Sequence, residues 1–246
     1  MESEPSAYYR HSRDEPSSHD QMVDRVKSQN LFRSGRAEKC MRLVDRRRFI
    51  PVECHSPYAD QSVQIGYGAW IAAPSIQAFC LDRLTEHLEP GSTVLDIGSG
   101  TGYLAAVMAL MLQGDTRPGQ ESGRVFAVEH IPELVATNKE IIKRYYPDLQ
   151  KVIEIVAGDG RQGLPEHGPY DCINVGAASE QLPSALLDQL KPGGRMICPV
   201  GIGYSQQLLV VDKRPDGSID ERVEYEGVEF PPLTSVSCQL DTETFD

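Results

Sequence analysis

The chain lacks the cysteine arrangements of a metal site or of a disulfide-stabilised secreted domain. No Cys-x-x-Cys pair occurs, and no His/Cys cluster has the spacing of zinc ligands. The six cysteines are scattered: Cys40, Cys54, Cys80, Cys172, Cys198 and Cys238. We interpret them as reduced, mostly buried thiols of a cytoplasmic protein, and we expect no bound metal.

Long hydrophobic runs and an excess of positive charge are also missing. The longest apolar stretch, around residues 105–112, is too short to span a bilayer, and the polar N-terminus lacks the apolar segment of a secretory signal. The formal net charge is −12 at pH 7. A nucleic-acid-binding surface needs Lys and Arg to displace counterions. We therefore expect neither a membrane nor a nucleic acid among the partners.

What the chain does have is enough apolar residues for one large core. Hydrophobic residues make up 40% of the 246 residues. We expect a disordered tail over 1–20, which is rich in Ser, Pro, His and charge, and a single domain over 21–246. Within this domain, a helical and loop segment (21–90) precedes a cofactor-binding core (91–200) and a C-terminal hairpin and tail (201–246).

A glycine-rich turn after residues 94–97 is the strongest local motif. The apolar run Val-Leu-Asp-Ile contains an acid at Asp96, and glycines follow at Gly98, Gly100 and Gly102, with Ser99 between the first two. Alternating glycines allow a sharp bend and close approach of a ligand. Because an apolar helix-forming stretch follows, we predict a strand, a binding loop and a helix whose N-terminus faces the ligand.

The core alternates short apolar runs with amphipathic stretches, which predicts an α/β fold with a doubly wound, mostly parallel sheet. Further strands are expected at 124–130, 152–156, 170–176 and 195–200, helices at 75–88, 133–146 and 182–190, and a hairpin at 206–212 and 219–225. The stretch 53–74 is interpreted as a loop, because Pro and Gly punctuate it.

The N-terminal segment 20–51 has helical periodicity, which Gly35 is expected to divide into two short helices. The run Arg46-Arg47-Arg48 is interpreted as a solvated face. The alternative is that these side chains attract an acidic substrate.

Three acids are expected at the carboxyl ends of neighbouring strands: Asp96, Glu129 and Asp159. Ligands of such folds bind at those ends. The acids can receive an ammonium group, a ribose diol and an adenine amine, and the ligand that carries all three is S-adenosylmethionine. NAD fits less well, because the glycine spacing is G-x-G-x-G and acids would repel a pyrophosphate. The fold is therefore expected to be of the Rossmann-like methyltransferase type.

The segment after the fourth strand argues against methylation of a nucleic-acid base. Amino-group methyltransferases often carry an Asn-Pro-Pro-Tyr-like segment there, whereas this chain reads Asn174-Val175-Gly176-Ala177-Ala178.

Over residues 22–240 the chain resembles the protein-L-isoaspartate (D-aspartate) O-methyltransferase family. Val-Gly-Ala-Ala at 175–178 and Asp-Gly-Arg at 159–161 are more specific to it than the glycine loop. The other matching segments are 56–60, 65–69, 73–74, 94–103, 156–158, 169–171, 188–195, 199–201 and 232–234.

The resemblance implies methyl transfer from S-adenosylmethionine to the α-carboxylate of L-isoaspartyl residues in damaged proteins, with S-adenosylhomocysteine as product. It implies cofactor contacts at Ala69, Trp70, Ile71, Ala72, Asp96, Glu129, His130, Asp159, Gly160, Thr234 and Gln239. A cytoplasmic monomer is expected, because damaged proteins of any identity require an open cleft.

The chain departs from the family pattern at its catalytic segment. Where the family reads Thr-Ile-Ser, this chain has Trp70-Ile71-Ala72, and Gln77 replaces a family histidine. In the family, the serine of this segment is the residue usually named as catalytic. This chain has Ala72 at that position and therefore lacks the hydroxyl group. The alternative function is therefore a cofactor-binding homologue that has lost or changed its activity and serves as a binding or regulatory module.

Overall fold

The structure, a computed structural model, describes residues 15–114 and 122–242. The predicted N-terminal tail thus lies largely outside the described residues, as does most of the polar connection after residue 113. Among the described residues, no helix combines the length and the apolar character needed to cross a membrane.

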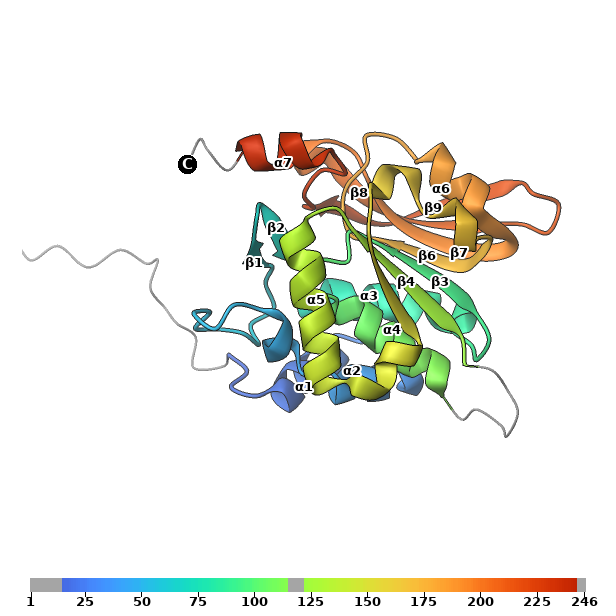
Figure 1. Ribbon diagram of the computed structural model, residues 1–246. Helices are drawn as coiled ribbons and strands as arrows, with labels where there is room; N and C mark the ends of the chain where they lie inside the picture. The colour runs from blue at the N-terminus through green and yellow to red at the C-terminus, as the bar shows by residue number, and fades with distance from the viewer. Residues whose placement is uncertain (1–14, 115–121, 243–246) are drawn as a thin grey trace, which may run out of the picture.

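A seven-stranded sheet forms the centre of the protein, in the order β5-β4-β3-β6-β7-β8-β9 (Figure 1). Strands β5 to β7 run parallel, and β8 and β9 are antiparallel to their neighbours. This confirms the predicted doubly wound, mostly parallel sheet. The strands are β3 (Thr93–Ile97), β4 (Arg124–Glu129), β5 (Ile153–Ala157), β6 (Tyr170–Val175), β7 (Leu190–Val200), β8 (Gln206–Lys213) and β9 (Ile219–Val228).

Helices cover both faces of the sheet. The α-helices are α1 (His19–Ser28), α2 (Gly35–Leu43), α3 (Pro74–Leu84), α4 (Tyr103–Gln113), α5 (Pro132–Tyr145), α6 (Ser184–Gln189) and α7 (Val236–Thr242). Short 3-10 turns connect them: η1 (Arg46–Phe49), η2 (Thr85–His87), η3 (Pro147–Lys151), η4 (Gly160–Gln162), η5 (Pro165–His167) and η6 (Gly203–Ser205).

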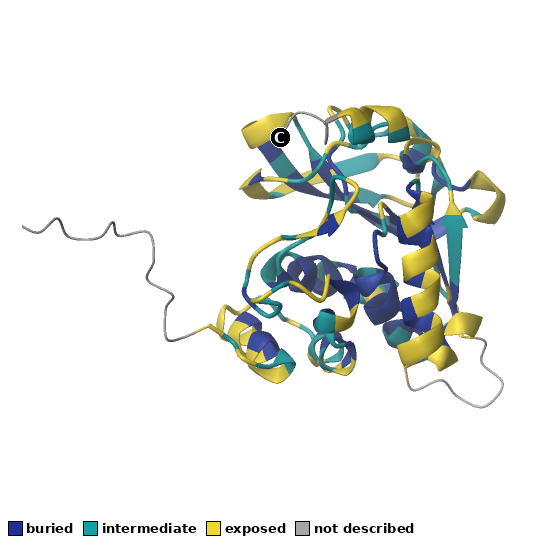
Figure 2. Cartoon of the chain, turned by 60° about the vertical axis from the view of Figure 1, so that its left-hand side comes forward, coloured by how far each residue is buried: buried dark blue, intermediate teal, exposed yellow. Residues whose placement is uncertain are grey.

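The core has two parts, one on each face of the sheet. The larger part joins helices α1 to α5 to one face, and the smaller part joins α6 and the loops around Leu164 to the other. Side chains alternate along β3 between these parts, so Val94 belongs to the first and Leu95 to the second. Figure 2 shows the buried residues concentrated in the sheet and on the inner sides of the helices. Asp96, two residues after Val94, shares the face of Val94.

Several boundaries differ from the sequence prediction. The stretch 53–74 contains a small hairpin, β1 (Val63–Gly66) and β2 (Ala69–Ile71), which is too short to show strand periodicity. Helix α7 lies in the predicted C-terminal tail, and α1 already begins at His19. Gly35 does not separate the first two helices: it is the first residue of α2, and the Ser34 hydroxyl caps that helix by accepting from the Arg36 amide.

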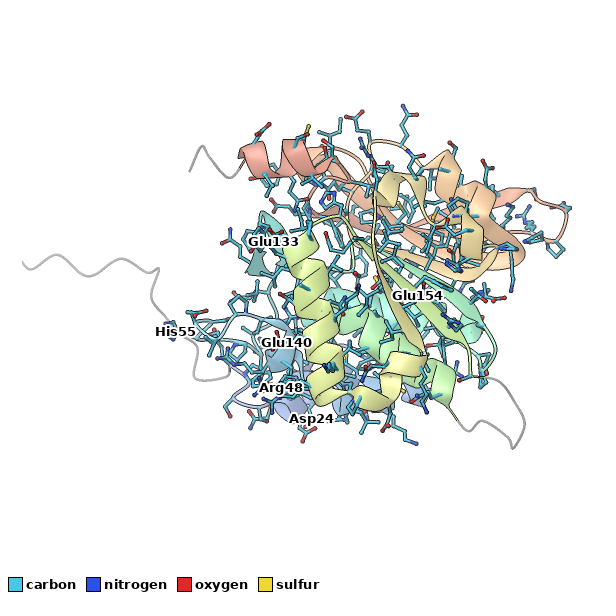
Figure 3. All side chains as sticks on the ribbon, viewed as in Figure 1. Asp24, Arg48, His55, Glu133, Glu140 and Glu154 are labelled. Atoms are coloured by element: carbon cyan, nitrogen blue, oxygen red, sulfur yellow. The ribbon has the colours of Figure 1, made fainter. Side chains whose placement is uncertain are left out.

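The interpretation of the basic run as a solvated face is wrong for its first residue. Arg46 is completely buried. Arg47 donates to the backbone oxygens of Val52 and Cys54 and so fixes the following loop. Only Arg48, which Figure 3 shows beside α5, is substantially exposed. Its guanidinium lies over the ring of Tyr145, the last residue of α5. The three arginines thus lie in three different environments, because consecutive side chains of a 3-10 turn point in different directions.

Gly102 begins α4 in a left-handed conformation and faces a buried side chain. Its φ is 93°, and a Cβ there would lie 2.2 Å from Asn138 Oδ1. We expect Gly102→Ala to lower the free energy of unfolding by about 2–4 kcal/mol, because backbone strain and overpacking add. Urea unfolding followed by circular dichroism measures this.

Gly193→Ala is the matched control for Gly102→Ala. Gly193 has a similar φ of 85°, but none of the described atoms lies within 4 Å of the point that a Cβ would occupy. This control should lose only about 1 kcal/mol from strain. Equal losses in the two variants would contradict the role of the Asn138 contact.

Candidate functional site

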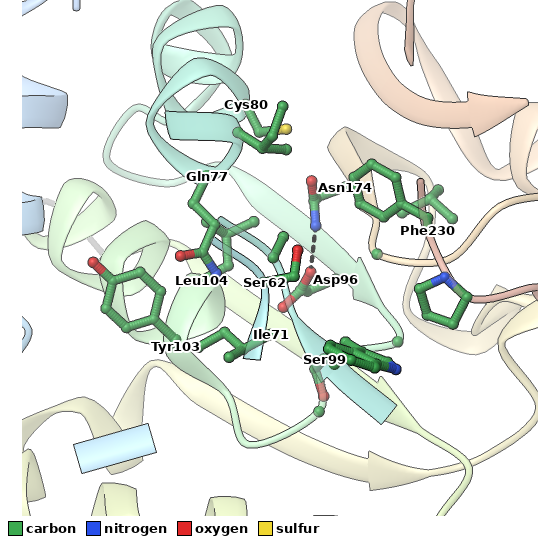
Figure 4. A pocket seen from close by; sticks show the side chains of 18 of the residues that line it. Ser62, Ile71, Gln77, Cys80, Asp96, Ser99, Tyr103, Leu104, Asn174 and Phe230 are labelled. Atoms are coloured by element: carbon green, nitrogen blue, oxygen red, sulfur yellow. Dashed lines mark hydrogen bonds between the residues drawn. The ribbon is translucent and has the colours of Figure 1, made fainter. Parts of the chain in front are cut away.

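A cavity of about 440 Å³ opens at the carboxyl ends of the parallel strands. The glycine loop after β3, the end of β6, strand β2, the start of α3 and the segment 229–232 enclose it. Its polar lining includes Asp96, Ser99, Asn174 and Gln77 (Figure 4). This is the edge of the sheet where the sequence places the ligand.

Asp96 is the buried acid of this cavity. The residue is 1% exposed, and its Oδ1 accepts a hydrogen bond of 2.8 Å from Asn174 Nδ2, whereas its Oδ2 has no partner among the described residues. Burial raises the pKa of Asp96 to about 7, the Asn174 amide opposes this shift, and nearby Glu129 adds to it. A cation in the cavity would remove the cost of ionising this carboxyl group.

The glycine loop is held against the neighbouring strand by its backbone. The amides of Gly98 and Ser99 both donate to the Val128 carbonyl, at 2.9 and 3.1 Å. The Ser99 hydroxyl is buried and finds no partner in the described part of the chain. The lining residues Ser99 and Asp96 thus each have one buried oxygen atom without a partner in the described part of the chain, and such buried polar atoms favour a polar ligand.

Glu129, at the end of β4, is 5% exposed and supports the loop. Its Oε2 accepts from the Gly100 amide and its Oε1 from the Ile131 amide, each at 2.9 Å. These bonds fix the carboxylate at the rim between the glycine loop and α5. Each carboxylate oxygen can accept a second donor, such as a ligand hydroxyl.

A second cavity, of about 50 Å³, adjoins the first, and both are lined by Trp70, Gly98 and Gly100. Two hydrogen bonds involve its lining residue Gln239: His130 Nε2 lies 2.8 Å from Gln239 Oε1, and Gln239 Nε2 donates to the Tyr67 carbonyl at 2.8 Å. The end of β4, the β1–β2 turn and α7 are thereby brought together. The sequence-predicted residues in this lining are Ala69, Trp70, Gly98, Gly100, Glu129, His130, Gly160, Thr234 and Gln239.

Two predicted residues lie outside both linings. The Asp159 carboxylate accepts from Arg161 Nη2 at 2.6 Å and from the Arg161 amide, which lowers the pKa of Asp159. Only its neighbour Gly160 lines a cavity. Gly102 contacts Asn138 instead of the cavity. The remaining predicted residues, Ile71, Ala72, Asp96 and Ser99, line the larger cavity.

Two residues of the site were not predicted from the sequence. In the sequence, Asn174 stands out only where the chain differs from the Asn-Pro-Pro-Tyr-like segment, although an amide on the strand next to a buried acid is the signal that could have identified it. Arg46 contacts the carbonyl of Ala72 from behind the cavity, at 2.8 Å. No periodicity in the sequence indicates this contact, since the two residues are 26 positions apart.

The cavity residues fit S-adenosylmethionine. An amino-acid ammonium group matches the unpartnered Asp96 oxygen, and left-handed glycines at 98 and 100, with φ of 69° and 54°, leave backbone free for close approach. Glu129 stands at the next strand end. Among the described residues, no group of three or more His, Cys, Asp or Glu is placed to hold a metal ion.

Several known proteins are similar to this chain. The protein-L-isoaspartate (D-aspartate) O-methyltransferase family matches residues 17–237. Protein-L-isoaspartate O-methyltransferase 1 of Arabidopsis thaliana is 46% identical over 222 residues, which cover 89% of this chain and 92% of the relative. The Caenorhabditis elegans protein-L-isoaspartate O-methyltransferase is 38% identical over 221 residues, covering 89% of this chain and 93% of the relative.

A solved structure from Plasmodium falciparum, described as a protein-L-isoaspartate O-methyltransferase in complex with S-adenosylhomocysteine, is also similar. Its TM-score is 0.79 at 31% sequence identity, and the alignment covers 89% of this chain and 99% of the other.

Proposed function

The chain belongs to the protein-L-isoaspartate (D-aspartate) O-methyltransferase family, and we propose that it methylates the α-carboxylate of L-isoaspartyl residues in damaged proteins. The observation that carries the proposal is the strand-end cavity, whose lining includes Asp96 and Ser99, each with a buried oxygen atom that has no partner among the described residues. The methyl donor is S-adenosylmethionine, which supplies an electrophilic methyl group when bound.

The chemistry asks little of an acid or base. A chain-end-like α-carboxyl group has a pKa of about 3.5, so it is ionised at neutral pH and needs no proton removed. A carboxylate oxygen bonds to the methyl carbon as the carbon–sulfur bond breaks, and S-adenosylhomocysteine leaves. The protein has to align these atoms and exclude water. The resulting ester can close to a succinimide with loss of methanol and reopen partly as normal aspartate, which constitutes repair.

In this proposal, different residues around the two cavities bind different parts of the cofactor. Asp96 pairs with the ammonium group, Glu129 accepts from the ribose hydroxyls, and Asp159 with Gly160 contacts the adenine. The loop residues Gly98, Ser99, Gly100 and Gly102 shape the turn. Further contacts are assigned to Ala69, Trp70, Ile71, Ala72, His130, Thr234 and Gln239. These assignments are supported by the linings of the cavities, except for Asp159 and Gly102.

The missing hydroxyl at Ala72 does not abolish the reaction, and it lowers the rate only to the extent that no other donor replaces it. One hydrogen bond to a charged carboxylate contributes roughly 1.5–3 kcal/mol, which corresponds to about 10- to 150-fold in rate. The second candidate function is a cofactor-binding module without activity. It is favoured by Trp70 and Ala72, which stand where the family has Thr and Ser.

We further propose that the protein acts as a monomer in the cytoplasm on isoaspartyl proteins and peptides.

Methyl transfer from labelled S-adenosylmethionine tests the proposal. We expect base-labile incorporation into an isoaspartyl peptide and at least ~100-fold less into the matching aspartyl peptide, because only the former presents an α-carboxylate on a side branch (a difference of roughly 3 kcal/mol or more). Calorimetry measures S-adenosylmethionine binding in parallel. Cofactor binding without methyl transfer would favour the second function.

A further inference from the structure

We propose that Gln77, oriented by the buried Arg46, donates a hydrogen bond to the substrate carboxylate and takes over the role of the hydroxyl that is missing at Ala72. This inference rests on the proposed function and specifies how the anionic substrate is held. It concerns the inner wall of the larger cavity, where α3 begins.

Arg46 fixes the orientation of the Gln77 amide. Arg46 Nη1 donates to Gln77 Oε1 at 2.7 Å and to the Ala72 carbonyl at 2.8 Å. An arginine side chain has only donors, so it must face the oxygen of the amide and not its nitrogen. The remaining amide nitrogen of Gln77 carries two N–H groups, and no hydrogen bond of Gln77 Nε2 is found among the described residues.

Gln77 and Ala72 belong to the same part of the cavity. Both line it, and because one nitrogen of Arg46 binds both, their bonded oxygens are no farther apart than two hydrogen-bond lengths. In Figure 4 the Gln77 side chain extends from α3 toward Ile71 and Tyr103, on the side of the cavity across from Phe230. An amide donor here can reach a group bound beside residue 72.

The positive charge behind Gln77 favours an anion. Arg46 is completely buried. Burial lowers its pKa to about 10, so the group stays charged at neutral pH. Asp60 is the one carboxylate among the groups that raise the pKa of Arg46, and its oxygens accept from the Ser75 amide and from Gln29. A cation that has no ion-pair partner in the described part of the chain polarises the amide between it and the cavity, and a bound carboxylate offsets part of its burial cost.

Trp70 is the competing donor. Trp70 also lines the cavity and carries an indole Nε1–H donor, but the residue is 45% exposed. Gln77 is 6% exposed and has its amide oxygen already fixed. A hydrogen bond in the drier position is stronger and requires less ordering.

Steady-state kinetics of two Gln77 variants test the inference. Gln77→Met removes the donor and keeps the length, and it should lower kcat/KM for an isoaspartyl peptide about 10- to 150-fold. Gln77→Glu still accepts from Arg46, and with greater stability, but it places a carboxylate against the substrate. Its kcat/KM should fall further, while its Tm rises and its affinity for S-adenosylmethionine stays within about threefold of wild type.

A merely structural role of Gln77 cannot raise Tm and lower kcat/KM together. Ala72→Ser in the Gln77→Met background should restore part of the lost rate, because a hydroxyl donor returns. Wild-type kcat/KM in both Gln77 variants, or equal losses of cofactor affinity and rate, would overturn the inference.

Peptide binding separates this inference from the proposed function. Isoaspartyl-peptide affinity is measured in the presence of S-adenosylhomocysteine, with Trp70 fluorescence as the signal. If the wild-type protein shows no turnover, the proposed function is refuted. The role of Gln77 is tested independently by peptide binding: Gln77→Glu should weaken it at least about tenfold, and unchanged binding would refute that role.

Discussion

Asp96→Asn is expected to weaken S-adenosylmethionine binding by about 150-fold or more at pH 8 and, at the same pH, to stabilise the ligand-free protein. Asp96 lines the cavity, one of its oxygens lacks a partner among the described residues, and its charge is the one that we assign to the cofactor ammonium group. Losing one partner of a buried ion pair costs about 3–5 kcal/mol. The asparagine keeps the shape and still accepts from Asn174, so the loop should remain in place.

The stability gain follows from the raised pKa of Asp96, about 7 in the folded protein. In the unfolded chain an Asp titrates near 3.9. Ionisation is therefore easier after unfolding, and the contribution of Asp96 to stability is greatest below about pH 4. This contribution is lost as the pH rises to about 7, by about 4 kcal/mol in total, and the stability does not change further above that pH. Asp96→Asn should remove this part of the pH dependence.

Calorimetric titration at pH 6, 7 and 8 and urea unfolding at the same values provide the two readouts. In the wild type, cofactor affinity should decrease below pH 7, because Asp96 must lose its proton to pair with the ammonium group. Asp188→Asn, an exposed acid on α6, is the matched control and should change neither quantity. A pH-independent wild-type affinity, or unchanged affinity in Asp96→Asn, would refute the assigned role.

Arg46→Met should be the most destabilising single substitution among those considered. The substitution removes the guanidinium group, which donates three hydrogen bonds. The acceptors that lose this donor are the carbonyls of Ala72 and Gln61 and the amide oxygen of Gln77. Each unsatisfied buried acceptor costs about 1–3 kcal/mol, and part of this is offset because a charge is no longer buried. We expect a net loss of about 3–5 kcal/mol, or a Tm lower by about 6–20 °C.

Differential scanning calorimetry of the ligand-free protein measures this loss. Arg48→Met is the matched control: Arg48 is two residues away, its side chain is 48% exposed, and its pair with Asp45 is long, at 3.8 Å. It should change stability by no more than about 1 kcal/mol. If Arg46→Met were as stable as Arg48→Met, the guanidinium would not be what holds the Ala72 segment.

The resemblance to the methyltransferase family is carried by local segments, and the comparisons confirm it. Segments such as residues 94–103 and 175–178 encode strand ends and tight turns, whose residue types are dictated by backbone geometry close to them in sequence. The parallel sheet was predictable for the same reason, because an apolar run, a glycine turn and an apolar helix repeat along the chain. The short hairpin at β1 and β2 was not predictable, since three or four residues do not establish a period.

The sequence by itself determined the fold and which strand ends carry acids, because both follow from order along the chain. Only the tertiary structure decided where the side chains of those residues point. Asp96 is buried, with one oxygen unpartnered among the described residues, whereas Asp159 is paired with Arg161. Arg46 and Gln77 are 31 residues apart, and only the packing of η1 behind β2 and α3 brings them together. Contacts over such separations depend on how elements pack and not on local pattern. For this reason the loss of a hydroxyl at Ala72 could be read from the sequence, and the amide donor at Gln77 could not.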